Sequence, residues 1–217
     1  MIQFRSGERA IAAGTDLFSI GKPANAIFTL VSGWAFLYQS LKDSRRQILH
    51  FALPGAVLGL LPGQAARAPY GAQALTDCVL CIIPHENLSP LSREVPEIGM
   101  RLSWLISHDL HLAFDHLTSV GRRSARERVT HLLLELFVRY RGQWPGNRID
   151  ELYLPLTQQH VGDAVGLTAV HVNRILRKLR EDGVIEFNYR HLRILDPDKL
   201  IDVSGLDPQL VISWVRK

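Results

Sequence analysis

Cysteine is scarce in this chain, because only Cys78 and Cys81 among its 217 residues carry a thiol. Two thiols give no disulfide framework and are typical of proteins in a reducing compartment. No run of about 18 apolar residues is present that could cross a membrane. The opening MIQFRSGERAIAAG lacks the basic start and apolar core of a signal peptide. We therefore expect a soluble, cytoplasmic protein without a membrane partner.

The motifs of common enzyme chemistry are absent as well. The sequence contains no GxxxxGKS/T phosphate loop, no HExxH zinc motif and no nucleophile elbow. We therefore expect that the protein has no catalytic residues and is not an enzyme.

Ligands for metals and cofactors are few. An iron–sulfur cluster needs four thiolates, so two cysteines do not hold one within a single chain. Cys78 and Cys81 lie three apart on an expected strand and face opposite sides, which favours structural cysteines over a redox pair. Three histidines fall on an expected helix without an obvious partner ligand: His108, His111 and His116. We predict no metal and no cofactor, while haem ligation by a β-domain histidine stays open: His50 or His85.

Charge is distributed unevenly along the chain. Residues 1–120 contain nine Lys/Arg and nine Asp/Glu, whereas residues 121–217 contain sixteen and twelve, which carries the whole net charge of +4. A polyanionic partner is therefore expected at the C-terminal part.

The first part of the chain has the sequence pattern of a β-domain. From Phe4 to about Pro84, short apolar or alternating runs such as AIFTLVSGWAFLYQS are separated by recurring glycines. This pattern predicts short strands joined by turns, in a sandwich or barrel-like domain.

A long helix is predicted next, from about residue 99 to 120. Its apolar positions recur every three or four residues over about 22 residues, or roughly 33 Å. The apolar face is too broad for one shallow contact, so we expect the β-domain on one side and an identical helix on the other. A helix that merely covers the β-domain is the alternative. The predicted dimerisation residues are Leu102, Leu105, Ile106, Leu110, Leu112, Ala113 and Leu117.

The helical pattern is expected to break at Gly121–Ser124, a candidate hinge. Ser124 with Glu127 three residues later has the form of a capping box, and a helix should run from there to about Tyr140. RGQWPGNRID is turn-forming, and ELYLPL predicts a short strand.

Residues 157–179 carry the pattern of a helix-turn-helix. Thr157 is a plausible N-cap, Gly162 leaves room where another helix would press, and Gly166 suits a turn with positive φ. Leu167 should fill the angle between the helices, and Thr168 should cap the second one. The expected inward positions are Val161, Val165, Val172, Ile175, Leu176 and Leu179. The run VIEFNYRHLRILD then predicts a β-hairpin, which is a wing able to touch phosphates.

The chain resembles regulators of the Crp/Fnr superfamily over nearly its whole length. The matching segments are SGWAFLYQSLKDSRRQILHFALPGAVLGL, SVGRRSARERVTHLLLEL and LTQQHVGDAVGLTAVHVNRILRKL. The resemblance implies an α+β chain in three parts: a jelly-roll-like β-roll effector domain (1–91), a dimerisation helix with hinge (92–123) and a winged helix-turn-helix (124–217). It also implies a homodimer on palindromic promoter DNA, with RNA polymerase as a partner.

The outward face of the second helix is the expected reader of DNA. The fork of Arg174 matches guanine O6 and N7, and Val170 stands where the family often has a glutamate, which favours a thymine methyl instead. A half-site unlike the family's best-known ones is therefore expected. The predicted DNA-binding residues are Thr157, Gln158, Thr168, Ala169, Val170, His171, Asn173, Arg174, Arg177, Lys178 and Arg190, with His191 as a further phosphate contact.

The charged residues with which cyclic-nucleotide members of the family hold their ligand are missing. Leu60 follows Gly59 where the family has a glutamate, Pro69 and Tyr70 occupy the region of its Arg-Ser pair, and Arg67 is out of register. Cyclic-nucleotide binding is therefore not expected. The leading hypothesis is a sequence-specific transcription regulator. The alternative is an effector-sensing protein that acts mainly through protein partners.

Overall fold

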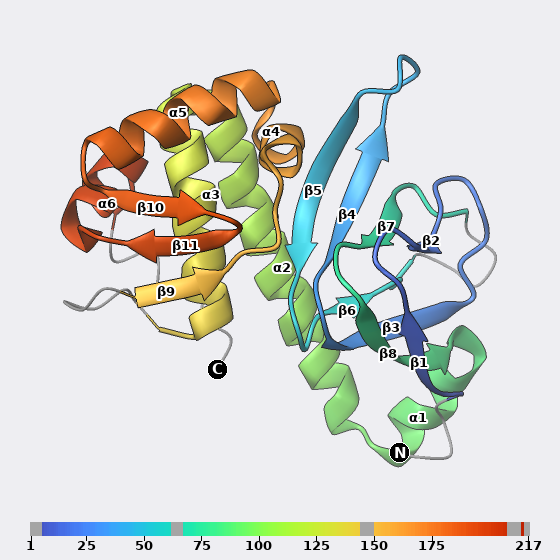
Figure 1. Cartoon of the computed structure of the whole chain (residues 1–217). Helices are drawn as coiled ribbons and strands as arrows, with labels where there is room; N and C mark the ends of the chain where they lie inside the picture. The colour runs from blue at the N-terminus through green and yellow to red at the C-terminus, as the bar shows by residue number, and fades with distance from the viewer. Residues whose placement is uncertain (1–5, 62–66, 144–149, 208–213, 215–217) are drawn as a thin grey trace. The chain divides into compact units, whose positions relative to one another are not determined.

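The computed structural model describes residues 6–61, 67–143, 150–207 and 214, and these fall into two compact units (Figure 1). The first unit comprises residues 1–110 and the second residues 111–217, so the division lies inside the long helix. The expected domain limits at residues 91 and 124 remain a prediction.

The first unit is built mainly of antiparallel strands, in two sheets of four. One sheet has the order β1-β8-β3-β6 and the other β2-β7-β4-β5. Together with the helical second unit, this confirms the predicted α+β class with an N-terminal β-domain. The strands are β1 (Gly7–Ile11), β2 (Asp16–Phe18), β3 (Ala26–Ser32), β4 (Ala35–Ser40), β5 (Arg46–Ala52), β6 (Val57–Leu58), β7 (Gly71–Ala74) and β8 (Cys78–Pro84).

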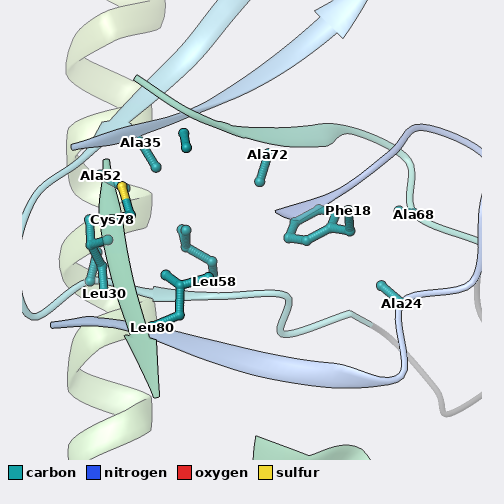
Figure 2. Packing of buried hydrophobic residues seen from close by; sticks show 12 residues of the cluster. Phe18, Ala24, Leu30, Ala35, Ala52, Leu58, Ala68, Ala72, Cys78 and Leu80 are labelled. Carbon is teal, nitrogen blue, oxygen red and sulfur yellow. The ribbon is translucent and has the colours of Figure 1, made fainter. Parts of the chain in front are cut away.

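Small and aliphatic side chains fill the interior of the β-domain. Figure 2 shows Phe18, Leu58 and Ala72 pointing toward one another from β2, β6 and β7. The turn between β3 and β4 requires glycine, because Gly33 has φ 87° and a Cβ there would lie 2.3 Å from the carbonyl oxygen of Asp77. The glycine-separated runs in the sequence therefore do correspond to strands and turns.

After the strands, a 3-10 turn η2 (His85–Asn87) and a short helix α1 (Leu88–Glu94) lead into α2 (Glu97–Arg122). At 26 residues, α2 is longer than the sequence indicated, because it continues through Gly121. The expected break at Gly121 is therefore wrong, and only Arg123 and Ser124 separate α2 from the next helix. A single glycine weakens a helix by about 1 kcal/mol, which neighbouring turns tolerate. Among the described residues, no helix has the length and apolar character of a membrane span.

The second unit is organised around α3 (Ala125–Arg141). Ser124 and Glu127 form the predicted capping box, and residues 129–138 of α3 are all buried. The helix packs against α4 (Gln158–Val165), α5 (Ala169–Glu181) and α6 (Pro197–Ser204). A sheet of order β10-β11-β9 completes the unit, from β9 (Asp150–Tyr153), β10 (Ile185–Asn188) and β11 (His191–Ile194).

A group of ionisable side chains joins the end of α2 to α3 within the second unit, with His131 buried and both Asp115 and Arg123 half-buried. His131 Nε2 lies 2.9 Å from Asp115 Oδ2, and Arg123 lies 3.4 Å from the same carboxylate. Burial raises the pKa of Asp115, but hydrogen bonding and charge from His131 and Arg123 outweigh it, so the pKa stays below its usual value. Burial lowers the pKa of His116, which also hydrogen-bonds to the backbone of Ala164 in α4.

Candidate nucleic-acid interface

Local capping fixes the two helices of the helix-turn-helix. The Thr157 hydroxyl accepts from the backbone N–H of His160 at 3.2 Å, and His160 Nδ1 accepts from the Thr157 N–H at 3.3 Å. The Thr168 hydroxyl accepts from the His171 N–H at 3.2 Å, and Gly166 ends α4 at φ 69°. The predicted caps and turn are confirmed, and each satisfies backbone groups that the helix itself leaves unpaired.

Gly162 is required by the turn between the helices. A Cβ at this position would lie 2.5 Å from the carbonyl oxygen of Leu167, whose own N–H donates to the Gly162 carbonyl at 3.0 Å. The neighbour that excludes a side chain is thus the backbone of the turn and not a helix, which corrects the reason expected from the sequence. The side chain of Leu167 is half-buried.

Helix α5 has one buried and one exposed face. Val172, Ile175, Leu176 and Leu179 are buried, which confirms the inward positions. Most of the predicted DNA-reading side chains are exposed, with Ala169 half-buried and Val170 at 64% exposure. The exposed ones on or beside α5 are Thr168, Val170, His171, Asn173, Arg174, Arg177 and Lys178.

The cations of α5 differ in what they contact. Arg177 Nε lies 3.6 Å from Glu181, and Lys178 Nζ lies 3.1 Å from Asp182. By contrast, Arg174 forms no ion pair within the part of the chain that the structure describes. Exposed ion pairs contribute little and exchange readily for phosphate, so Arg177 and Lys178 are suited to phosphates. The guanidinium of Arg174 is therefore available to a ligand from outside this chain.

The wing turn places two exposed side chains in an unusual backbone conformation. Tyr189 and Arg190 have φ 50° and 67°, as a two-residue hairpin turn with left-handed residues requires. Tyr189 is 97% exposed. The sequence reasoning missed this residue, although an aromatic side chain at the tip of the predicted hairpin was a usable signal. His191, in contrast, contacts Glu151 at 2.7 Å and so already has an acidic partner.

A pocket of about 340 Å³ opens between the start of α4, the exposed side of α5 and the wing. Its polar lining residues include Gln158, Asn173, Arg180 and Arg190, and no acidic side chain lines it. The structure thus brings the predicted residues Thr157, Gln158, Asn173 and Arg190 together around one cationic pocket.

The predicted dimerisation residues divide between two sides of α2. Leu105 and Leu112 are buried at 7% and 3% exposure, so these two side chains serve the packing of the chain itself. Ile106, Leu110 and Leu117 are at least half exposed. Leu102 is half-buried and Ala113 is exposed. The exposed side also carries two large apolar residues that the sequence reasoning had left out: Met100 and Phe114.

The described residues of the β-domain contain no charged pair of the kind with which cyclic-nucleotide members of the Crp/Fnr superfamily hold their ligand. Leu60 is half-buried, Pro69 has no donor in its side chain, and the Arg67 guanidinium donates to the Gly21 carbonyl at 2.8 Å. Residues 62–66 of the same segment lie outside the described residues. That no cyclic nucleotide binds therefore stays a prediction, which the described residues of this segment support.

Cys78 and His85 of the β-domain make contacts with its backbone. The Cys78 thiol is buried and hydrogen-bonds to the Trp34 carbonyl at 3.2 Å, and burial raises its pKa. His85 Nε2 lies 2.9 Å from the Gly59 carbonyl oxygen. Within the described ranges, no group of three or more His, Cys, Asp and Glu side chains is placed to hold a metal ion.

A β-domain, a long helix and a capped, winged helix-turn-helix with a basic exposed face together define a DNA-binding transcription regulator. Comparison with known proteins agrees. The profile of the Crp-like helix-turn-helix domain matches residues 127–203, and that of the cyclic nucleotide-binding domain matches residues 8–94.

Individual relatives are similar along most of the chain. The transcriptional activatory protein AadR of Rhodopseudomonas palustris is 32% identical over 186 residues, covering 84% of this chain and 75% of that protein. The nitrogen fixation regulation protein FixK of Bradyrhizobium diazoefficiens is 31% identical over 192 residues, covering 87% and 78%. The structure of FixK2 from Bradyrhizobium japonicum matches with a TM-score of 0.81 at 27% identity, covering 93% of this chain and 98% of that one.

This chain belongs to the Crp/Fnr family, whose members are transcription regulators and not enzymes.

Proposed function

We propose that the protein is a homodimer that binds a two-fold symmetric promoter site and inserts α5 of each protomer into a major groove. The observation that carries the proposal is the exposed face of α5, where Arg174 is free of any ion pair among the described residues. The two recognition helices of such a dimer lie about 34 Å apart, one turn of B-DNA.

The exposed residues of α5 have separate roles in this proposal. Arg174 reads guanine through O6 and N7, and Val170 packs on a thymine methyl. Thr168, at the start of α5, holds a phosphate together with the first backbone N–H groups. Arg177, Lys178 and the wing contact phosphates. The sequence-independent part of the affinity therefore falls with salt.

Selection of bound sequences from a random DNA pool, at two salt concentrations, tests the DNA-binding role. The expected result is a palindrome with half-sites one helical turn apart. Arg174→Ala should weaken binding to the selected site by about 1–3 kcal/mol while leaving random DNA almost unchanged. Arg177→Ala is the matched control on the same helix, and it should weaken both DNAs alike. Equal weakening of both DNAs by Arg174→Ala would remove its proposed base-reading role.

The dimer is proposed to form through the exposed apolar side of α2. Leu110 and Leu117 are 50% and 69% exposed and lie two turns apart on this side. A charge there should separate the protomers, because it would be buried without a partner. Light scattering should give a dimer mass for the wild type and for Arg122→Glu, which adds a carboxylate at an exposed position about 140° round the helix from Leu117. Leu110→Glu and Leu117→Glu should give monomers, and dimers in both variants would contradict this interface.

We further propose that the protein acts on transcription in the cytoplasm through RNA polymerase. Support comes from relatives named as transcriptional activators. In vitro transcription from the selected site, with and without the protein, gives the direction of the effect. Unchanged transcript levels would contradict this part of the proposal and leave the DNA binding untouched.

A further inference from the structure

The two helices of the helix-turn-helix are joined by a contact between side-chain amides. Gln158 is the first residue of α4, and its Nε2 donates to Oδ1 of Asn173 in α5 at 3.1 Å. Both residues are exposed, fifteen positions apart in the chain. The capped first turn of α4 holds the backbone of Gln158 in place, since Thr157 and His160 form a reciprocal capping box there.

The surroundings favour one orientation of the Asn173 amide. Arg180 and Arg190 line the same pocket as Gln158 and Asn173, and no carboxylate does. A carbonyl oxygen is stabilised near cations and N–H donors, whereas an amide N–H is not. Oδ1 of Asn173 therefore faces Gln158 and the cationic pocket, and Nδ2 is left with both of its hydrogens for another partner.

We infer that Gln158 is a positioning residue that sets the base preference of Asn173, by turning the Asn173 amide so that it presents a donor to the DNA. This inference rests on the proposed insertion of α5 into a major groove. In that groove guanine and thymine present acceptors at O6 and O4, whereas cytosine presents a donor at N4. An asparagine held in this way prefers guanine or thymine over cytosine. Without Gln158, the amide rotates freely and accepts or donates equally well.

The test measures dissociation constants for a set of duplexes that carry each of the four bases at one position of the selected site. The position is the one whose preference Asn173→Ala abolishes. The wild type should favour guanine or thymine over cytosine there by about fivefold, the worth of one hydrogen bond. Gln158→Ala should reduce this ratio to about one, and the double variant Gln158→Ala/Asn173→Ala should show no further change.

Gln159→Ala is the matched control, since Gln159 is the next exposed residue of α4 and hydrogen-bonds to Asp163 instead. It should retain the wild-type ratio. The far-UV circular dichroism spectrum and the urea unfolding midpoint should match the wild type in all variants, which reports that the fold is intact.

The possible outcomes distinguish a failure of the proposed DNA-binding function from a failure of the positioning role of Gln158. A wild type that selects no sequence contradicts the proposed function itself. A wild type that selects a site, while Gln158→Ala keeps the full preference or the two substitutions act additively, contradicts only the positioning role. A preference of the wild type for cytosine would show that the Asn173 amide faces the other way.

Discussion

Replacement of Gly162 by alanine has an effect whose sign depends on the tertiary structure. In an isolated helix, alanine is favoured over glycine by about 1 kcal/mol. In this fold, the new Cβ would lie 2.5 Å from the Leu167 carbonyl oxygen and 3.5 Å from the Ala169 nitrogen. Both are backbone atoms, so relief requires movement of the turn and not of a flexible side chain.

The magnitude follows from the size of that movement. Ordinary van der Waals contact begins at 3.4 Å, so the carbonyl of Leu167 must shift by about 0.9 Å. Such overpacking typically costs about 1–3 kcal/mol, which exceeds the gain in helix propensity. We expect Gly162→Ala to lower the free energy of unfolding by about 1 kcal/mol net. It should also weaken DNA binding, because α5 begins at the displaced turn.

The matched control is Gly121→Ala in α2. Gly121 is helical with no positive φ, and a Cβ there would meet nothing within 4 Å. This variant should therefore stabilise the protein by up to about 1 kcal/mol. Urea unfolding followed by far-UV circular dichroism compares both variants with the wild type, and titration with the selected duplex measures their binding. If Gly162→Ala stabilised the protein as Gly121→Ala does, with unchanged DNA affinity, the reasoning about the turn would be refuted.

Three further substitutions test the second unit. Thr168→Ala removes the cap of α5 and should cost about 1 kcal/mol in urea unfolding; a change below a few tenths would show that the cap is dispensable. Burial lowers the pKa of His116 in the folded protein. As the pH falls, the unfolded chain therefore takes up this proton at a higher pH than the folded protein does. The free energy of unfolding should consequently fall as the pH drops below about 6.5. His116→Gln should flatten that fall and the exposed control His171→Gln should not, whereas equal slopes would reject the assignment. Glu135→Ala should lower the free energy of unfolding by about 1.5–3 kcal/mol, because it removes the carboxylate that accepts from the Arg139 guanidinium at 2.7 Å in a buried position. A joint replacement of both residues by leucine should cost less.

The β-domain illustrates where sequence patterns suffice. Strands of the first unit occur where glycines separate the apolar runs, because a turn with positive φ needs glycine whatever surrounds it. The sequence likewise shows that positions 60 and 69 carry leucine and proline in place of charged residues, since a ligand-binding side chain is either present or absent. The order of strands in the two sheets could not, because pairing joins residues far apart in the chain.

The long helix illustrates the opposite case. The apolar stripe of α2 was evident from the sequence, but not which of its residues the chain itself covers. Leu105 and Leu112 are buried, while Leu110 and Leu117 are exposed, and all four are leucines at helical spacing. Their difference arises from what packs against each side of the helix. Similarly, the continuation of α2 through Gly121 depends on the stability of neighbouring turns.

The sequence by itself determined the helix-turn-helix, because its caps and turns consist of hydrogen bonds between residues no more than five apart. Thr157 with His160, Thr168 with His171 and Gly162 with Leu167 are of this kind. Only the tertiary structure decided which polar side chains on the surface of the helix-turn-helix are already hydrogen-bonded to other side chains of the chain. Gln158 meets Asn173 across fifteen positions, and such contacts depend on the path of the backbone between them.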